Sequence, residues 1–453
     1  MKQITFICLF FILVTTANAL ESTAIKQPKT PEIWTPMEAV AFAISNNPDS
    51  FIAKKRIEEA QATAAMAKAA DYPLVNLSAE YSQTDTPMYS FGNILNQGAF
   101  DNTIDFNDPG RTDNLNLKTE IAYRIYNGGR DKAEIEAADA AAGISRSNLI
   151  AVHHRLGFEV IKTFQAIIQA EEMVKVRQAA LDAITASLNV GKARYDAGDL
   201  LREDLLNLDL QQSLASEDLI QTRHNLELTK RSFLNLLGLH RGDVILSDER
   251  DIDQQQIPET IDYRNRQELQ RLLGMEQVSL ALLKKAEGGE QPTIDAFASY
   301  QIDGGAVLEE AGDSWMAGVK MNYNLFDGQK TSSAIAKAKS RVSEIEGLIR
   351  KTELALNLEI QQAELDYQQA QKRLIVTEKM VTVAEEGTRL RRARFIEGVI
   401  LASDLIEFEM RLSDAQARQL TAKARFQVAI ANLRRVAGLP QFPNTEMTQK
   451  ESQ

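Results

Sequence analysis

The sequence predicts a mainly α-helical chain with a membrane β-barrel part. Long antiparallel helical hairpins make up most of the chain, and four β-strands per chain contribute to a barrel that several chains share. Three observations predict this fold class: a long proline-free helical stretch that occurs twice, four segments that alternate between apolar and polar residues, and an apolar amino-terminal segment typical of exported proteins.

The helical stretch of the first copy runs without a proline from Gly129 to Gly238, and a second proline-free stretch lies between Pro292 and Pro440. The octapeptide YRIYNGGR, which begins at Tyr123, returns as YNLFDGQK 200 residues later (323 − 123 = 200). RYDAG returns as RFIEG, and LGL as AGL, with the same offset. A constant offset over this length predicts an internal duplication with no net insertion between these landmarks.

The duplication sets the predicted domain boundaries. Pro73 returns as Pro292 (292 − 73 = 219), so the first copy carries nineteen extra residues (219 − 200 = 19), which we assign to a loop at Thr84–Thr112. In chain order we predict a signal peptide at 1–19; a first repeat at 20–239, with strands at about 74–83 and 115–126 and long helices at about 129–237; a linker at 240–261; a second repeat at 262–439, with strands at about 293–302 and 315–326 and long helices at about 329–437; and a mobile tail at 440–453.

Helix boundaries are marked by residues that suit helix ends. Thr35 can cap a helix whose first turn holds Pro36. Gly198 and Gly398 interrupt the long helical stretches and predict tight reversals there. The first long helix of the second copy carries a heptad-like seam, made of Leu356, Ile360, Ala363, Tyr367, Ala370, Leu374, Thr377, Val381 and Ala384.

The amino terminus is typical of a signal peptide, with Lys2, an apolar run from Ile4 to Val14, and the small residues Ala17 and Ala19 at the cleavage site. The only cysteine, Cys8, lies inside this run, so the mature chain would have no thiol, which excludes disulfides and thiolate chemistry. No run of eighteen apolar residues follows. A mature chain that crosses a membrane would therefore do so as β-strands.

The strands have one apolar and one polar face, as Leu117 and Ile121 alternating with charged residues illustrate. Such strands also occur in the half-buried sheets of soluble proteins. In a membrane barrel the polar face would line the lumen. The predicted lumen residues are Lys118, Glu120, Arg124, Lys320, Asn322 and Asn324. Four strands are too few to close a barrel that leaves a channel, and lipid does not tolerate an open sheet edge, so several chains would share one barrel. Three chains would give twelve strands.

Charge and motifs exclude several functions. The net charge of −12, with no basic cluster, argues against a nucleic-acid partner. The sequence contains no HExxH, GxGxxG or GxxxxGK[ST] motif, and its four histidines are not spaced as metal ligands. We therefore predict no enzymatic activity, no cofactor and no metal site.

The turns YNGGR and FDGQK, the two reversal glycines, and LGL and AGL together resemble the TolC-like outer membrane efflux protein (outer membrane factor) family. The resemblance covers nearly the whole mature chain. It implies a homotrimeric channel-tunnel, with a twelve-stranded β-barrel in outer membrane lipid and an α-barrel in the periplasm. It also implies passive export of small molecules such as drugs or metals. An inner-membrane transporter would drive this export through a periplasmic adaptor (membrane fusion) protein.

The resemblance further implies a periplasmic gate. In the family, acidic residues six and nine positions after the second reversal glycine form the constriction, which gives Asp404 and Glu407 here. Asp204 follows the first reversal glycine at the corresponding position. One helical turn apart, Asp404 and Glu407 would lie on one face and form two acidic rings in a trimer. Without the resemblance, all three are ordinary solvated helix charges.

The chain departs from the family pattern near the second reversal. Phe395 stands where an aromatic hydroxyl helps to hold the gate shut, and Ile400 stands at the position of an arginine. Such a closing network is therefore not expected here, although Arg202, Arg391 or Arg394 could take the place of the arginine.

Two other functions stay open from the sequence. The chain could serve type I protein secretion in place of small-molecule efflux, because the pump selects the cargo. In another class, the heptad-like helices are also typical of a secreted coiled-coil scaffold or adhesin.

Overall fold

The computed structural model describes residues 30–247 and 261–442. The predicted signal peptide, most of the predicted linker and most of the predicted tail lie outside these residues. The first copy comprises α1 (Pro36–Asn46), α2 (Pro48–Lys68), β1 (Leu74–Thr84), α3 (Pro87–Asn96), β2 (Thr112–Tyr126), α4 (Arg130–Asp196) and α5 (Arg202–Leu236). The second copy comprises α6 (Gln267–Glu287), β3 (Thr293–Gly304), β4 (Ala311–Asn322), α7 (Lys330–Ile396) and α8 (Ala402–Val436).

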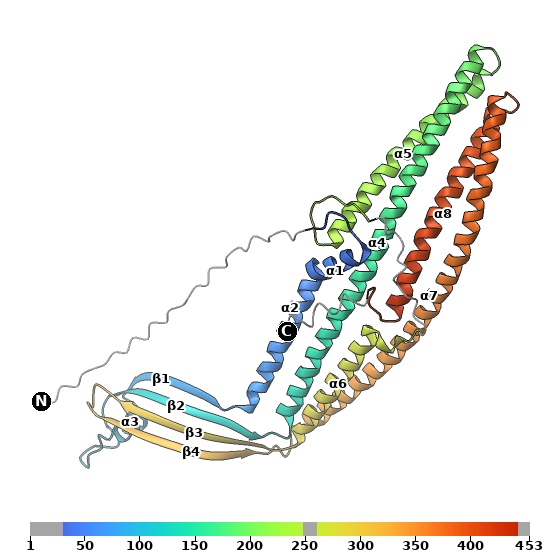
Figure 1. Ribbon diagram of the computed structural model, residues 1–453. Helices are drawn as coiled ribbons and strands as arrows, with labels where there is room; N and C mark the ends of the chain where they lie inside the picture. The colour runs from blue at the N-terminus through green and yellow to red at the C-terminus, as the bar shows by residue number, and fades with distance from the viewer. Residues whose placement is uncertain (1–29, 248–260, 443–453) are drawn as a thin grey trace. The chain divides into compact units, whose positions relative to one another are not determined.

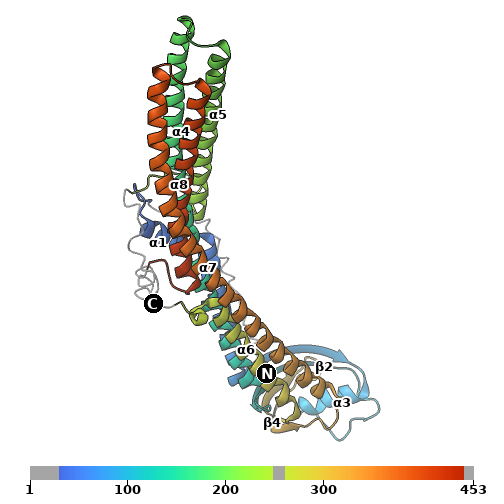
Figure 2. The ribbon, with the colours of Figure 1, turned by 90° about the vertical axis from the view of Figure 1, so that its right-hand side faces the viewer.

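The equivalent helices of the two copies have equal lengths. The helices α4 and α7 both have 67 residues, α5 and α8 both have 35, and α2 and α6 both have 21. Each long helix packs against its shorter partner, α4 against α5 and α7 against α8 (Figures 1 and 2). Within the described residues, none of the helices is both long and apolar enough to cross a membrane.

Helix ends follow from local residue chemistry. Thr35 and Glu38 form a reciprocal capping box at the start of α1, which confirms the predicted cap. The long helices α4 and α7 each end in a Schellman motif, in which a glycine adopts a left-handed conformation. The predicted seam of α7 is confirmed at six positions, because Leu356, Ile360, Ala363, Ala370, Thr377 and Val381 are buried.

The four strands form one antiparallel sheet in the order β1-β2-β3-β4. The register places the apolar residues of neighbouring strands on one face, where Ile121 pairs with Val75 and Ala298. The charged residues share the other face, where Lys118 lies opposite Gln301. The apolar face is open, since Leu77 and Trp315 are 79% and 76% exposed. The sheet therefore presents to its surroundings the residues that normally form a core.

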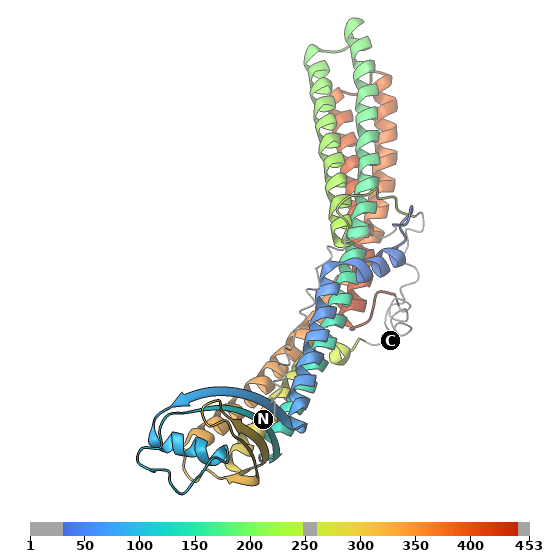
Figure 3. The ribbon, with the colours of Figure 1, turned by 90° about the vertical axis from the view of Figure 1, so that its left-hand side faces the viewer.

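Two predictions are wrong: the loop between the first two strands, and the bounds of the fourth strand, which begins at Ala311 rather than at about 315. The predicted loop at Thr84–Thr112 contains the helix α3, which begins at Pro87 and covers one end of the sheet (Figure 3). The second strand of the second copy ends at Asn322, so the predicted lumen residue Asn324 lies outside it. The strand β4 ends at Asn322 because its pairing partner β3 begins at Thr293, which lies opposite Asn322. The residue before Thr293 is Pro292, which has no N–H to continue the ladder of hydrogen bonds.

The first hairpin consists of α4 and α5, and its base is the part of it near the end of α5; α7 and α8 form the second hairpin, whose base lies near the end of α8. The apolar core of the described chain lies mainly at the base of the first hairpin. Trp34, Phe164 and Phe233 are almost fully buried there, and the Trp34 ring meets the Phe233 ring edge-on at a centroid distance of 5.9 Å. The helix α1 contributes Val40 to the same cluster and packs on α4. A smaller cluster, which includes Leu433, lies at the base of the second hairpin.

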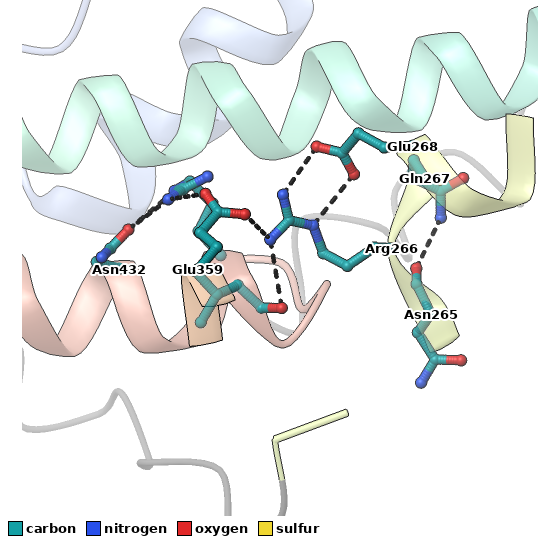
Figure 4. Close-up of polar contacts among 8 residues, drawn as sticks. Asn265, Arg266, Gln267, Glu268, Glu359 and Asn432 are labelled. Carbon is teal, nitrogen blue, oxygen red and sulfur yellow. Dashed lines mark hydrogen bonds and ion pairs between the residues drawn. The ribbon is translucent and has the colours of Figure 1, made fainter. Parts of the chain in front are cut away.

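Ion pairs complete the base of the second hairpin (Figure 4). Arg266 is 4% exposed and contacts both Glu268 and Glu359 at 2.9 Å. Arg435 reaches Glu359 at 2.8 Å and also donates to Asn432. Burial opposes the charge of Arg266, but Glu268 and Glu359 outweigh it and raise its pKa. Burial would likewise raise the pKa of Glu268, yet the hydrogen bonds and charge of Arg266 lower it.

Candidate gate at the helical tips

The reversal glycines Gly198 and Gly398 form the tips of the two hairpins. Their φ angles are 85° and 77°, a left-handed conformation that other residues adopt only with strain. At each tip the second residue after the helical cap donates its N–H to a carbonyl five residues back, from Asp199 to Arg194 and from Val399 to Arg394. These bonds satisfy helix-end carbonyls and make the reversals tight.

Arg194 joins the two tips. Its Nη1 donates to the carbonyl oxygen of Phe395 at 3.1 Å, and its Nη2 donates to the carbonyl of Asp199 at 3.1 Å. The guanidinium also lies 5.3 Å from the centre of the Phe395 ring, within the range of a cation–π contact. The arginine therefore holds the second tip from the last turn of the first long helix. Arg194 is not among the predicted gate residues, although its repeat partner Arg394 is named there. The repeated patterns RYDAG and RFIEG place the two arginines at equivalent positions and could have indicated Arg194.

Phe395 is a core residue of the tips. Its side chain is 1% exposed and packs with Ile184, Leu208 and Leu405, while Ile400 packs against the same cluster. A phenol hydroxyl buried here would need a hydrogen-bond partner among apolar side chains. This explains why a ring without a hydroxyl, and an aliphatic residue at position 400, suit this chain.

The acidic gate residues lie in the first turns after the reversals. Asp204 in α5 and Asp404 in α8 are half-buried, and neither makes an ion pair within the described parts of the chain. Glu407 lies one turn after Asp404 and is exposed, with an ion pair to Arg411 four residues on. The two carboxylates of α8 thus lie at the spacing that puts them on one helix face.

Two other arginines near the second tip, Arg391 and Arg392, contact α8 rather than Phe395. Arg391 lies over the ring of Phe408 at 4.7 Å from its centre. Arg392 makes a two-point ion pair with Glu409, with Nη2 at 2.7 Å from Oε2. The hydrogen bond to Glu409 raises the pKa of Arg392, against the opposing effect of burial. These contacts fix α7 to α8 immediately above the reversal.

Five of the six predicted lumen residues lie on the polar face of the sheet, whereas Asn324 lies beyond the end of β4. Lys118 contacts Glu120 at 2.8 Å. Arg124 contacts Asp295 at 3.3 Å, and Lys320 lies opposite Asp295 in the neighbouring strand. The polar face of the sheet therefore carries charges of both signs, some of them in ion pairs.

Among the described residues, no three histidine, cysteine, aspartate or glutamate side chains are grouped as they would be to hold a metal ion. A family model described as "Outer membrane efflux protein" matches residues 40–239 and 264–439, which is more than half of the chain. The chain belongs to the outer membrane efflux protein family. The resemblance to TolC-like efflux proteins drawn from the sequence is thereby confirmed.

Individual proteins extend this likeness. The efflux protein is 23% identical over 394 residues to nodulation protein T of Rhizobium leguminosarum bv. trifolii, covering 83% of this chain and 80% of that protein. It is similar in fold to the outer-membrane channel OprN, with a TM-score of 0.76 and 17% identity over 90% of this chain and 91% of that chain. VceC from Vibrio cholerae gives the same TM-score at 16% identity, over 89% of this chain and 96% of that chain.

Family membership fixes the general function. The protein is an efflux channel of the outer membrane, and it is not an enzyme. A secreted coiled-coil scaffold or adhesin, left open by the sequence, is therefore excluded.

Proposed function

We propose that this efflux protein forms a homotrimeric channel-tunnel, the exit duct of a tripartite export system for small molecules. An inner-membrane pump would supply the energy through a periplasmic adaptor, and the helical part would stand in the periplasm. The exposed apolar face of the sheet carries the proposal. The opposite face of the sheet is polar and carries ion pairs. A sheet with these two faces suits a barrel whose outer surface contacts lipid and whose lumen holds water.

The open sheet supports a shared barrel. The strands β1 and β4 are the edges of the four-stranded sheet, and each is paired on one side only within the described chain. Unpaired edge groups cost several kcal/mol each in lipid. Three chains arranged edge to edge, β4 against β1, would pair every edge and give twelve strands.

Planar bilayer recordings test this proposal. Purified protein should conduct, and its mass in detergent should be that of a trimer. A monomer without conductance would contradict it. Isolation of the adaptor with the tagged trimer, and the solutes that accumulate in a deletion strain, would then separate small-molecule efflux from type I protein secretion.

We further propose that Asp404 and Glu407, with Asp204, form the periplasmic constriction. Their places after the two reversals support this, as does the absence of an ion pair at either aspartate within the described residues. Asp404→Ala with Glu407→Ala should lower the cation-to-anion permeability ratio by roughly three-fold or more, because two acidic rings would be lost.

The matched control is Asp366→Ala with Glu378→Ala, which removes two exposed charges of α7 away from the tip. Reversal potentials in a salt gradient report the ratio. Equal effects of the two double variants would show that the constriction is elsewhere.

A further inference from the structure

The first copy contains an insert, residues 85–111, where the second copy has only residues 305–310 between its strands. The insert forms α3 and then a turn-rich segment. All four strands join their helices at one end of the sheet, and the insert lies at the other end. In the proposed channel the insert would therefore stand at the outer mouth.

The contacts of Gly312 show which face of the sheet the insert covers. Gly312 pairs with Asp303, which accepts hydrogen bonds from Asn114 and Asn116 on the polar face. A Cβ at Gly312 would lie 2.2 Å from the carbonyl oxygen of Asn96, at the end of α3. The end of α3 therefore lies directly over the polar face.

Buried polar contacts hold the insert in this position. Gln97 is 1% exposed, and its Nε2 donates to the carbonyl of Asp113 at 2.7 Å and to Oδ1 of Asn114 at 3.1 Å. Asn93 donates to the hydroxyl of Thr112 at 3.0 Å. Because buried hydrogen bonds of this kind are costly to break, the insert is fixed to β2 rather than free to leave the mouth.

The same end of the sheet is latched to the short connection of the second copy. The carboxylate of Asp113 accepts the N–H groups of Ala306 and Val307 at 2.9 and 2.8 Å. Aromatic contacts hold the rest of the insert together, with Phe91 and Phe106 at a centroid distance of 4.5 Å. Both connections at this end therefore form one packed unit.

We propose that the insert narrows the outer mouth of the duct and forms a second constriction, separate from the acidic gate at the helical tips. This inference rests on the proposed channel, in which the polar face lines the lumen. The side of α3 that carries Ser90 and Ile94 is buried, whereas Met88 is 78% exposed. Met88 therefore projects into the proposed lumen, and three inserts in a trimer would reduce the open area of its mouth.

Replacing residues 85–111 by the second copy's own connection, Gly305 to Glu310, tests the constriction. Single-channel conductance should rise by about two-fold or more, because the narrowest part of the mouth is removed. Unchanged conductance of a correctly assembled trimer would overturn the inference.

A labelling experiment decides the matter even if that variant fails to assemble. The only cysteine, Cys8, lies in the predicted signal peptide, so an introduced thiol is unique in the mature chain. A bulky maleimide on Met88→Cys should reduce conductance by about half or more. The same label on Leu77→Cys, on the exposed apolar face, should leave it unchanged.

The two outcomes of failure are distinct. Wild-type protein that never conducts would overturn the channel itself. Wild-type protein that conducts, with no effect of the label at position 88, would overturn only the second constriction.

Discussion

The two copies of the repeat close the bases of their long hairpins with different chemistry. The first base is apolar, with Trp34, Phe164 and Phe233 almost fully buried. The second is held by the ion pairs of Arg266 and Arg435 around Glu359 (Figure 4). Since the helices have equal lengths, the backbone alone does not explain this difference.

Aligned positions show what the two bases share. Asn47 donates to the carbonyl of Leu236 at 2.7 Å, and Arg266, its equivalent at an offset of 219 (266 − 47 = 219), donates to Val436 at 3.4 Å. Both bonds satisfy a carbonyl in the last turn of the hairpin's second helix, which has no partner inside the helix. The same backbone requirement is thus met by an amide in one copy and by a guanidinium in the other.

The helix α1 accounts for the difference in chemistry. It covers the first base with Val40 and Ala43, and a surface covered in this way can be apolar. The second base has the short turn Tyr263–Asn265 in the corresponding place. Accordingly Phe164 corresponds to Glu364 (364 − 164 = 200), a charge that remains in contact with water. The comparison shows that the presence of α1, rather than the repeated hairpin itself, decides which base holds the apolar core.

The largest effect is expected at the centre of the apolar base. Phe233→Ala should lower the free energy of unfolding by about 3–5 kcal/mol, because it removes a fully buried ring and leaves a cavity. Leu433→Ala, the equivalent change in the second copy, should cost about 2–3 kcal/mol, since its cluster is smaller. Denaturation midpoints in detergent measure both.

Leu228→Ala, at a half-exposed position of α5, is the control and should cost well under about 1 kcal/mol. Equal losses for Phe233→Ala and Leu433→Ala would mean that the two bases contribute alike, against the comparison.

A smaller loss is expected in the charged base. Arg266→Ala leaves Glu268 without its ion-pair partner and Glu359 with Arg435 alone. Breaking a fully buried pair costs about 3–5 kcal/mol. Both glutamates are partly exposed, so we expect about 2–3 kcal/mol, measured as a shift in the unfolding midpoint. Arg266→Asn, which copies Asn47, should recover part of this loss if the shared carbonyl contact matters. Equal destabilisation by both variants would show that only the charges contribute.

Much of the fold follows from the sequence because repeats and alternation are local signals. The offset of 200 residues gave the hairpins, and the alternation around Ile121 gave the two faces of the sheet. The order of apolar and charged residues along a strand is sufficient to assign its two faces, since successive side chains point to opposite faces.

The rest depends on contacts between distant segments. Arg194 meets Phe395 across 201 residues, and no pattern within either helix indicates that contact. The sequence does not predict the helix α3, because its segment contains Gly92 and two asparagines, Asn93 and Asn96, which weaken a helical pattern. Its position depends on Gln97 reaching β2, a tertiary contact that outweighs local propensity.

Glycines at the hairpin ends sharpen the comparison between tip and base. Gly238, at the base, has a φ of 80°, and a Cβ there would lie 2.7 Å from the carbonyl oxygen of Asn46. Gly198, at the tip, has a similar φ but open space around it. Gly238→Ala should therefore cost about 2–3 kcal/mol and Gly198→Ala about 1 kcal/mol. Unfolding midpoints of the two variants, measured side by side, would contradict this if Gly198→Ala were the more damaging.

The smallest effect concerns pH and again separates the copies. His153 in α4 contacts the hydroxyl of Ser50 at 3.0 Å, and burial, aided by the charges of Lys54 and His154, lowers its pKa from 6.5 to about 4. Its equivalent in the second copy is Glu353 (353 − 153 = 200).

Between pH 6.5 and 4 the unfolded chain protonates His153 while the folded chain keeps it neutral, so the unfolded state binds more protons. Stability is therefore intact above pH 6.5 and falls as the pH is lowered towards 4, by on the order of 1–2 kcal/mol after screening by solvent. Comparing unfolding midpoints at pH 7 and 4.5 tests this, and His153→Gln should reduce the difference. If His153→Gln kept the full pH dependence, the loss would belong to carboxylates such as Glu268, whose lowered pKa also costs stability in acid, and the second base would be the pH-sensitive one.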